Sequence, residues 1–502
     1  MTEPAPPADD LLAQLRALQA RDLPVHGGRT LAYVYDSGLA EVDRVGREAV
    51  AAYAGSNGLD PTAFPSLLAM ENDLVGTAAD LLDGPEGCVG NVTSGGTESV
   101  LLAVQGARDA HAVRHPGPDR PAPAMVLPDT AHAAFHKAAH YFGVEAVLVP
   151  TGERTGWRAD VEATAAALDL LGDRAALVVA SAPSYAHGVV DPVTELAALA
   201  AARGVRCHVD ACIGGWVLPW AARQGRAVPP WTFAVEGVTS ISVDLHKYAY
   251  APKGTSVLLH RTAALRRPQL FASAAWPGYT MLNPTLQSTR SGGPLAGAWA
   301  VVRSIGDTGY DLLVRDVLAA VDAIVAAATD IPGLRVVVPP DSSLVALATD
   351  ETCDAFTVCD EMAARGWYVQ PQMSFAGHPP TVHLSVSAAT RPHVPELVTA
   401  LAASVAAAQA AGPVQVDPGV AAYVGALDPA ALTDADFDGL LDAAGLGGPS
   451  DGGGLDLPTR MAEVNALLDL AAPALREAVL VSFLDRLQRP VRGGTGSSGP
   501  AA

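Results

Sequence analysis

The chain has 502 residues, of which 17% are charged and 49% are apolar, and this composition excludes a disordered polyelectrolyte. Its formal net charge of −21 disfavours nucleic acid and anionic membranes as partners. We find no run of about 18 apolar residues that would span a bilayer, and the start MTEPAPPADD lacks the pattern of a secretion signal. The five cysteines show no C-x-x-C spacing, so we expect reduced thiols in a cytoplasmic protein.

Residues 1–85 are predicted to form a loose Pro-rich arm of nine residues followed by helices. Leu11, Leu15 and Leu18 share one helical face, and further periodic segments follow. These segments cover 39–54 and 65–83. We expect a layer of helices here, without a sheet of its own.

Residues 86–294 are predicted to form a large α/β domain, because short apolar runs alternate with helical stretches. Several of these runs are too continuously apolar for strands with one wet face, which indicates a sheet covered on both sides. The pattern predicts a doubly wound domain with a largely parallel sheet. Its strands are expected at 88–93, 124–128, 144–149, 176–181, 205–209, 239–243 and 255–260.

A smaller α+β domain is predicted over residues 295–446. It begins with an Ala-rich helix at 295–330 that leaves the large domain. The expected strands are 333–338, 342–348 and 381–387, and the expected helices are 355–365 and 392–411.

Residues 447–502 are predicted to hold a linker, a helix and a flexible tail. Helical pieces at 427–446 and 458–488 flank the Gly-rich stretch GGPSDGGG. The sequence indicates no role for this part of the chain.

The chain contains only three lysines, Lys137, Lys247 and Lys253, whereas its other 29 basic residues are arginine. A guanidinium stays protonated and delocalised, so arginine cannot supply a nucleophilic amine. Any chemistry that needs a primary amine must therefore use one of these three positions.

The segment SISVDLHKYAYAPKG, residues 240–254, places Lys247 just after an apolar strand, where open α/β sheets bind their ligands. A lysine among apolar and aromatic neighbours is expected to lose its proton readily and to form a Schiff base. The alternative is a surface lysine in a salt bridge. The scarcity of lysine and the neighbouring histidine favour the chemical role.

The segment NVTSGGTESV, residues 91–100, ends a strand and opens a helix at Thr97. Gly95 and Gly96 permit close backbone approach, and N–H groups at a helix start form a seat for a phosphate. Taken alone, Gly-Gly also fits an ordinary turn.

The segment RCHVDACIGGW, residues 206–216, ends an apolar strand at Asp210. A carboxylate buried there needs a cationic partner, and a protonated pyridine nitrogen would supply it and make the ring an electron sink. The alternative is an Asp that caps a helix.

His132, His136 and His140 stand four residues apart in TAHAAFHKAAHYF. No acidic residue and no H-E-x-x-H pattern accompany them, so we expect no metal site. His132, nearest the helix start, is placed to lay its ring on a planar cofactor, and Lys137 is interpreted as a helix-face charge.

A phosphate seat, a stacking imidazole, a carboxylate for a ring nitrogen and an amine for an aldehyde are the attachment needs of pyridoxal 5′-phosphate. Their occurrence in one α/β domain therefore predicts this cofactor.

SGGTES, AHAAFHKAA, HVDACIGGW, SVDLHKYAYAPKG and STRSGGPLAGAW together resemble the group II pyridoxal-dependent decarboxylase superfamily of fold type I. Within it they are most similar to the sphingosine phosphate lyases, from about Val25 to about Leu446. The resemblance implies a homodimer with active sites at the subunit interface. It implies a Schiff base at Lys247, Asp210 on the pyridine nitrogen and His132 over the ring. The cofactor-binding residues that it further implies are Gly95, Gly96, Thr97, His246 and, reaching the neighbouring subunit, Thr289.

This reading predicts a carbon–carbon lyase that acts on a small amino substrate. When a carbon bearing a β-hydroxyl is aligned with the ring electrons, the bond to it breaks as a retro-aldol reaction, with Lys247, Tyr185 and His187 as candidates for proton transfer. Amino-acid decarboxylation is the alternative, for which Arg290 would clamp the carboxylate unless it forms a structural ion pair. An aminotransferase and a non-catalytic protein of the same fold fit the motifs less well.

The substrate-binding residues implied by the resemblance match the related lyases only in part. Tyr35 and Lys253 match positions that hold the substrate phosphate in the sphingosine phosphate lyases, but Asp60, in SNGLDP, replaces a histidine of that loop. A carboxylate beside a phosphate dianion would cost roughly 1 kcal/mol or more. We therefore expect a different polar substrate, either unphosphorylated or carrying an amine.

Overall fold

The computed structural model describes residues 7–443, 459–488 and 490. Most of the predicted arm, the Gly-rich linker and the predicted tail lie outside the described residues. The three predicted N-terminal helices are present as α1 (Ala8–Gln19), α2 (Ala40–Ala52) and α3 (Pro65–Leu81).

The large domain contains all seven predicted strands in one sheet of order β1-β7-β6-β5-β4-β2-β3. Only β7 runs antiparallel to its neighbours, which confirms a largely parallel sheet. Every residue of β2, β4, β6 and β7 is buried, which agrees with the predicted sheet covered on both sides. The strands are β1 (Val89–Thr93), β2 (Ala124–Pro128), β3 (Glu145–Val149), β4 (Ala175–Ser181), β5 (Arg206–Asp210), β6 (Ser240–Asp244) and β7 (Ser256–His260).

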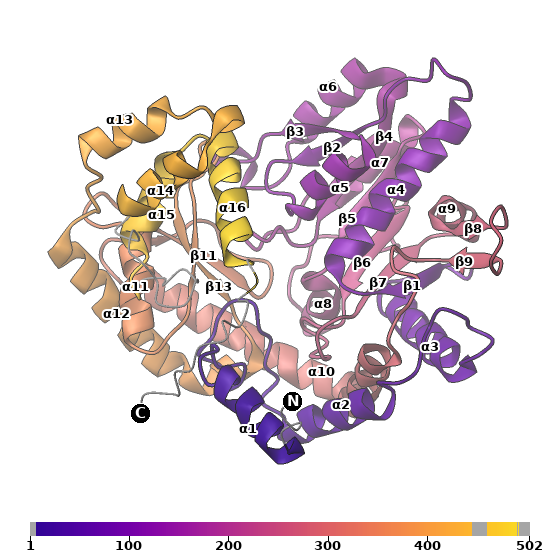
Figure 1. Cartoon of the computed structure of the whole chain (residues 1–502), viewed down its shortest axis with the longest axis horizontal. Coiled ribbons are helices and arrows are strands. Elements are labelled where there is room, and N and C mark those ends of the chain that lie inside the picture. The colour runs from indigo at the N-terminus through magenta and orange to yellow at the C-terminus, as the bar shows by residue number, and fades with distance from the viewer. Residues whose placement is uncertain (1–6, 444–458, 489, 491–502) are drawn as a thin grey trace, which may run out of the picture.

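Helices cover both faces of this sheet (Figure 1). They are α4 (Gly96–Arg114), α5 (Ala134–Phe142), α6 (Val161–Leu171), α7 (Val193–Ala202), α8 (Leu218–Arg223) and α9 (Ala263–Arg266). A short hairpin of β8 (Phe271–Ser273) and β9 (Met281–Asn283), which the sequence analysis did not predict, follows α9.

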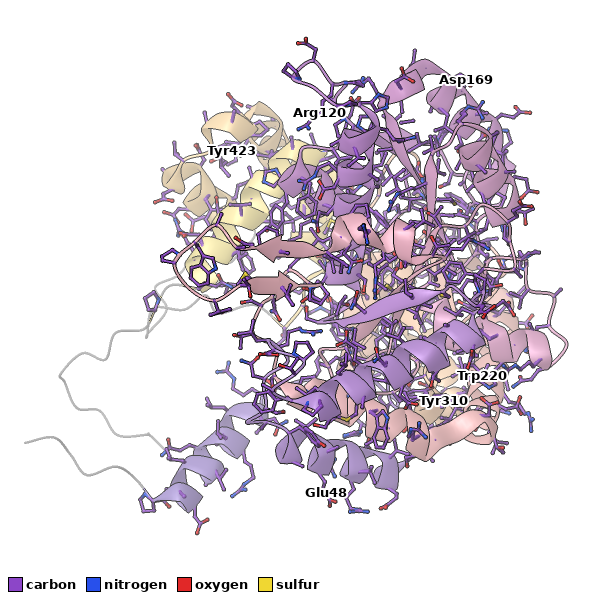
Figure 2. All side chains as sticks on the ribbon, turned by 90° about the vertical axis from the view of Figure 1, so that its right-hand side faces the viewer. Glu48, Arg120, Asp169, Trp220, Tyr310 and Tyr423 are labelled. Atoms are coloured by element: carbon purple, nitrogen blue, oxygen red, sulfur yellow. The ribbon has the colours of Figure 1, made fainter. Side chains whose placement is uncertain are left out.

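The long helix α10 (Gly292–Thr329) links the two domains along the bottom of Figure 1 and is kinked at Gly306, where φ is +61°. Trp220 of α8 packs on Tyr310 of α10 with ring centroids 5.0 Å apart, and Figure 2 shows these two side chains next to each other. The Tyr310 hydroxyl donates a hydrogen bond to the Ala249 carbonyl at 2.9 Å. This contact fixes α10 to the loop that carries Lys247.

The small domain is built on an antiparallel sheet of order β10-β11-β13-β12. Its elements are β10 (Leu334–Val336), β11 (Leu344–Thr349), α11 (Ala355–Ala364), β12 (Gln370–Gln372), β13 (Thr381–Ser385) and α12 (Val394–Ala411). Strand β12 was not predicted. The stretch Ala388–Ala411 is long and apolar enough to cross a membrane, yet Leu397, Leu401 and Val405 are buried in the core of this domain.

The C-terminal helices have an apolar core of their own, formed by residues such as Val424, Leu440 and Leu475. The predicted helix at 458–488 is two helices, because Pro473 cannot continue a preceding helix and instead begins the next one. The four helices are α13 (Pro418–Ala426), which was not predicted, α14 (Asp434–Ala443), α15 (Ala462–Leu470) and α16 (Pro473–Leu487).

Candidate active site

A cavity of about 380 Å³ lies at the carboxyl ends of β1, β5 and β6. The pairing register brings these ends together, since Asp210 lies opposite Ser242 and Asp244 lies opposite Ser256. The position is the one at which open α/β sheets bind ligands. The predicted site residues that line the cavity are Gly95, Gly96, Thr97, His132, Tyr185, Asp210, His246 and Lys247.

Lys247 lies in the loop after β6, three residues beyond Asp244. Two aromatic side chains anchor this loop: the Tyr248 hydroxyl donates to the Val386 carbonyl at 2.9 Å, and Tyr310 holds Ala249. The Lys247 Nζ lies 2.8 Å from Asp244 Oδ2. The reactive amine is therefore held in one place by the main chain and by an ion pair.

The ion pair corrects the expectation that Lys247 loses its proton readily. Burial is the largest single influence and by itself lowers the pKa of Lys247, but Asp244, Tyr35 and Cys212 together outweigh it, and the resulting pKa lies well above its usual range. Conversely, burial raises the pKa of Asp244, but Lys247 and His246 together with hydrogen bonds outweigh it, and the net shift is downward. Deprotonation of the lysine thus requires a change in its contact with Asp244.

Gly95 and Gly96 form a narrow cradle at the start of α4. A Cβ atom at Gly96 would lie 2.8 Å from the Asp244 carboxylate oxygens, and one at Gly95 would lie 3.2 Å from the His246 ring. The first N–H groups of α4 have no partner within the helix and point to its amino end. Since glycine alone fits and the N–H groups are free, the cradle suits a phosphate.

The Asp210 carboxylate is buried at the end of β5 and accepts a hydrogen bond from the Cys212 N–H at 3.1 Å through Oδ1. This contact closes a turn after the strand and is not the helix cap of the alternative, because the next helical turn begins only at Gly214. Its Oδ2 has no hydrogen-bond partner among the described residues. That oxygen is available for a cation in the cavity.

The His132 ring faces the open cavity and is fixed by its own backbone, because Nδ1 accepts a hydrogen bond from the Ala134 N–H at 3.1 Å. In the neutral ring the hydrogen is therefore on Nε2. Desolvation by the surrounding protein is the main cause that lowers the pKa of His132. A neutral, flat ring of this kind suits stacking on a planar group.

Tyr35 and Lys253 lie against each other, whereas Tyr185 lines the cavity itself. The Lys253 Nζ lies 4.8 Å from the centre of the Tyr35 ring and donates to the Tyr33 carbonyl at 2.9 Å. Desolvation, and then the charge of Lys247, lower the pKa of Lys253 to about 8. Burial raises the pKa of Tyr35 to about 12, so the phenol stays protonated.

Six predicted residues do not line this cavity within the chain: Tyr35 and Lys253, which lie outside its lining, and four more. His187 is buried against Trp157 with ring centroids 4.6 Å apart, and burial lowers its pKa to about 3. Thr289 and Asp60 are exposed, and Asp60 accepts hydrogen bonds from Thr62. Arg290 lines a neighbouring cavity. His187 is thus no candidate for proton transfer at this cavity, because its imidazole is enclosed by aromatic rings.

Arg290 forms the structural ion pair that the sequence analysis left open. Its guanidinium lies 3.4 Å from the Glu71 carboxylate and donates to the Val92 carbonyl at 3.1 Å. The donor groups of Arg290 are therefore used to hold the loop 285–291 against β1 and α3.

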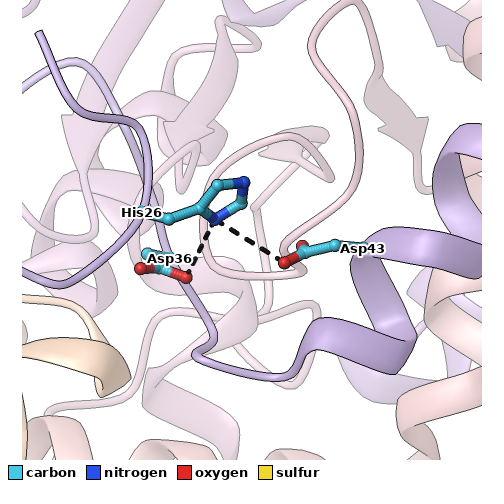
Figure 3. A group of neighbouring side chains, drawn as sticks. All are labelled: His26, Asp36 and Asp43. Carbon is cyan, nitrogen blue, oxygen red and sulfur yellow. Dashed lines mark ion pairs between the residues drawn. The ribbon is translucent and has the colours of Figure 1, made fainter.

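The loop that carries Tyr33 and Tyr35 is held by a small cluster of one imidazole and two carboxylates. Figure 3 shows His26 between two carboxylates, with Nδ1 3.5 Å from Asp36 and 3.6 Å from Asp43. Asp36 also accepts hydrogen bonds from backbone N–H groups on both sides of the loop. The cluster joins the loop to the start of α2.

Sequence reasoning missed three residues of the site. Asp244 carried a signal, because an acidic side chain at a strand end three residues before the lysine can reach it. Gln370, in β12 of the small domain, accepts a hydrogen bond from the Tyr185 hydroxyl at 2.6 Å. Tyr33 follows in the same chain of hydrogen bonds. Neither Gln370 nor Tyr33 lies near a recognisable motif.

Comparison with known proteins places this site in a family. Residues 35–345 match the pyridoxal-dependent decarboxylase conserved domain, and residues 418–486 match the C-terminal putative HTH domain of pyridoxal-dependent enzymes. The chain therefore belongs to the pyridoxal-dependent decarboxylase family, whose cofactor is pyridoxal 5′-phosphate. The predicted family, fold class and cofactor are confirmed, and a pyridoxal-dependent lyase of the decarboxylase superfamily is the enzyme class that this family implies.

Within the family, the chain is similar to sphingosine-1-phosphate lyases. It is 37% identical over 353 residues to the enzyme of Arabidopsis thaliana, covering 69% of this chain and 62% of that one. The Oryza sativa enzyme is 35% identical over 388 residues, covering 76% of this chain and 69% of that one. The chain thus spans less than two thirds of the Arabidopsis relative.

Solved structures agree with these matches. The structure of Burkholderia pseudomallei sphingosine-1-phosphate lyase superposes with a TM-score of 0.75 at 33% identity, over 82% of this chain and 93% of that one. Glutamate decarboxylase of Lactobacillus brevis superposes with a TM-score of 0.71 at 17% identity, over 82% of this chain and 94% of that one. The second match supports the fold alone.

The described residues fit the cofactor. A cradle that only glycine can form, a free carboxylate oxygen on Asp210, a ring on His132 and an amine on Lys247 meet in one cavity. Each corresponds to one of the groups that pyridoxal 5′-phosphate presents.

Proposed function

We propose that the protein is a pyridoxal-dependent lyase that cleaves the bond between the amine-bearing carbon and a β-hydroxyl carbon of its substrate, as a retro-aldol reaction. The observation that carries this proposal is the convergence of Lys247, Asp210, His132 and the Gly95–Gly96 cradle on one cavity, with a tyrosine facing it. When bound, the cofactor supplies a covalent link to the substrate amine and an electron sink for the electrons of the broken bond.

The residues would divide the binding tasks as follows. The cradle and the start of α4 hold the phosphate, and His246 lies beside it. Asp210 would hold the ring nitrogen in its protonated form, and His132 would stack on the ring and exclude water. Lys247 would supply the amine that binds the aldehyde.

Proton transfer falls to Tyr185 and Lys247, which both face the cavity. A base must take the hydrogen of the β-hydroxyl, and an acid must return a hydrogen to the carbon that keeps the amine. The Lys247 amine would serve as one of these groups, because it lines the same cavity.

Decarboxylation of an amino acid is the second candidate. It needs a cation to hold the substrate carboxylate, and the guanidinium of Arg290 is engaged with Glu71 and backbone carbonyls. Because these contacts occupy the Arg290 guanidinium, retro-aldol cleavage is favoured over decarboxylation.

We further propose that the substrate is not sphingosine phosphate but another polar amine. Asp60 replaces the histidine of the related loop, and Lys253 is the cation that lies beside Tyr35. A single lysine whose pKa is lowered to about 8 holds a phosphate dianion weakly near that pH.

A homodimer is proposed as the active form. Leu11, Leu12, Leu15 and Leu18 of α1 are exposed, as are Phe271, Trp276, Tyr279 and Leu282 at the β8–β9 hairpin. Apolar surface of this extent is typical of a subunit interface. Thr289, exposed in its own chain, would then face the neighbouring site. Sedimentation analysis tests this assembly, and a monomer with full activity would refute it.

We propose a cytoplasmic location and no nucleic-acid partner. Residues 418–486, which match a putative HTH domain, carry eleven acidic and three basic side chains. This charge repels a phosphate backbone. We therefore expect no salt-dependent DNA binding, and such binding would contradict the proposal of no nucleic-acid partner.

A panel of amines tests the function. Purified protein with the cofactor is incubated with β-hydroxy amines, amino acids and phosphorylated long-chain bases, and aldehyde and CO₂ are measured separately. We expect aldehyde from an unphosphorylated β-hydroxy amine. CO₂ release would favour the decarboxylase, and efficient cleavage of the phosphorylated base would refute the argument from Asp60.

A further inference from the structure

The single hydroxyl hydrogen of Tyr185 points away from the cavity. Tyr185 lines the cavity, yet its hydroxyl donates to Gln370 Oε1 at 2.6 Å, in β12 of the small domain. A phenol has one hydrogen to donate. Toward the cavity, the Tyr185 oxygen can therefore only accept a hydrogen bond.

The orientation of the Gln370 amide gives this hydrogen bond its direction. Its Nε2 donates to the Tyr33 hydroxyl oxygen at 3.2 Å, and its Oε1 accepts from Tyr185. A reversed amide would leave its oxygen facing Tyr33 and would make Tyr185 a donor toward the cavity. The role of Tyr185 thus depends on the amide orientation, in which Tyr33 is the partner of Nε2.

Tyr33 is held in an unusual backbone conformation. Its φ is +63°, in the left-handed region that a residue with a side chain rarely adopts. The Lys253 Nζ bonds to its carbonyl at 2.9 Å, and its ring lies 5.8 Å from that of Tyr368. Strained backbone of this kind persists where the surroundings fix it, and it is frequent at functional sites.

We propose that Gln370 and Tyr33 are positioning residues that make Tyr185 a hydrogen-bond acceptor, so that the site selects amines carrying a hydroxyl next to the amine-bearing carbon. This inference rests on the proposed function and adds the residues through which the site would recognise the hydroxyl. An amine without the hydroxyl leaves the Tyr185 oxygen unpaired in a desolvated cavity, and sites of this kind discriminate strongly against such analogues.

The test compares two small amines, 3-amino-2-butanol and its analogue 2-aminobutane, which lacks the hydroxyl. Dissociation constants are measured from the change in cofactor absorption of the loaded enzyme when each amine is added. We expect the hydroxy amine to bind the wild type about tenfold more tightly, the value of one good hydrogen bond.

Three variants separate positioning from structure. Gln370→Met removes both amide contacts and should bring the two dissociation constants together. Gln370→Glu keeps only an acceptor toward Tyr185 and should retain the preference. Tyr33→Phe, which leaves the ring contacts, should reduce the preference if the amide is then free to turn.

Gln372→Met is the matched control, since Gln372 lies in the same strand and accepts a hydrogen bond from Thr381 at 2.7 Å instead. It should keep the wild-type preference. A wild type that holds the cofactor covalently but binds both amines equally would overturn this inference and leave the proposed function standing. A wild type that holds no cofactor would overturn both.

Discussion

The cofactor side and the substrate side of the cavity are built in different ways. On the cofactor side, Gly95, Asp210 and Lys247 come from the ends of neighbouring strands or the loops that follow them, so one sheet fixes their distances. On the substrate side, Tyr33 and Gln370 come from the N-terminal loop and the small domain. The comparison indicates that the sheet sets the chemistry, whereas packing between distant segments sets the choice of substrate.

The largest loss of activity is expected from a change at Lys247, on the cofactor side. Replacing Lys247 with alanine removes the amine that binds the cofactor and transfers protons, and we expect activity to fall at least about a thousandfold. Steady-state assays of aldehyde release measure the loss. Lys137→Ala is the control, because Lys137 lies exposed on α5 over the Tyr141 ring and should leave activity unchanged. A substantially active Lys247→Ala protein would remove the basis of the proposed mechanism.

The two aspartates of the cofactor side should have separable effects. Asp210→Asn cannot keep a hydrogen on the ring nitrogen, so we expect kcat to fall by roughly a hundredfold while the cofactor remains bound. Asp244→Asn removes the main group that raises the pKa of Lys247. The amine should then be free at lower pH, and cofactor attachment followed by absorption should quicken near neutral pH. Equal effects of both changes on the attachment profile would contradict these assignments.

The substrate side should respond to pH through Lys253. Its pKa is lowered to about 8, so the side chain is a cation below that pH and a neutral amine above it. We expect inorganic sulfate, whose own charge is constant, to compete with substrate below pH 8 and to lose this effect as the pH rises. In the Lys253→Arg variant, sulfate should compete with substrate at all these pH values, because a guanidinium stays protonated. If sulfate competition also disappeared with rising pH in that variant, the titrating group would be a residue other than Lys253.

The smallest effect on chemistry is expected at Arg290. Arg290→Met breaks a largely buried ion pair with Glu71, so we expect a loss of about 2 kcal/mol in the free energy of unfolding, measured by denaturant titration. The aldehyde-to-CO₂ ratio should stay unchanged. A change in that ratio would mean that the guanidinium reaches the substrate.

The fold of the large domain could be predicted because every position in β2, β4, β6 and β7 is buried, and most of these positions are apolar. Short elements such as β8, β9 and β12 left no such signal, since three residues give no period. The long helix expected at 458–488 was wrong at one point, where Pro473 starts a new helix.

The cofactor side of the site could be predicted from local patterns, since each group stands at a strand end within its own motif. The protonation of Lys247 could not, because it depends on the distance to Asp244, which the turn after β6 sets. His187 was proposed for proton transfer together with Tyr185, two residues before it, but the chain turns its ring toward Trp157. Tyr33 and Gln370, 337 residues apart, meet only in the folded chain.

Reduction of the cofactor-loaded protein with borohydride, followed by peptide mass spectrometry, tests the central claim most directly. Reduction turns the link between the cofactor aldehyde and a lysine amine into a stable adduct. The account predicts this adduct on the peptide that contains Lys247 and on no other lysine. An adduct on Lys253 or Lys137, or no adduct at all, would contradict it.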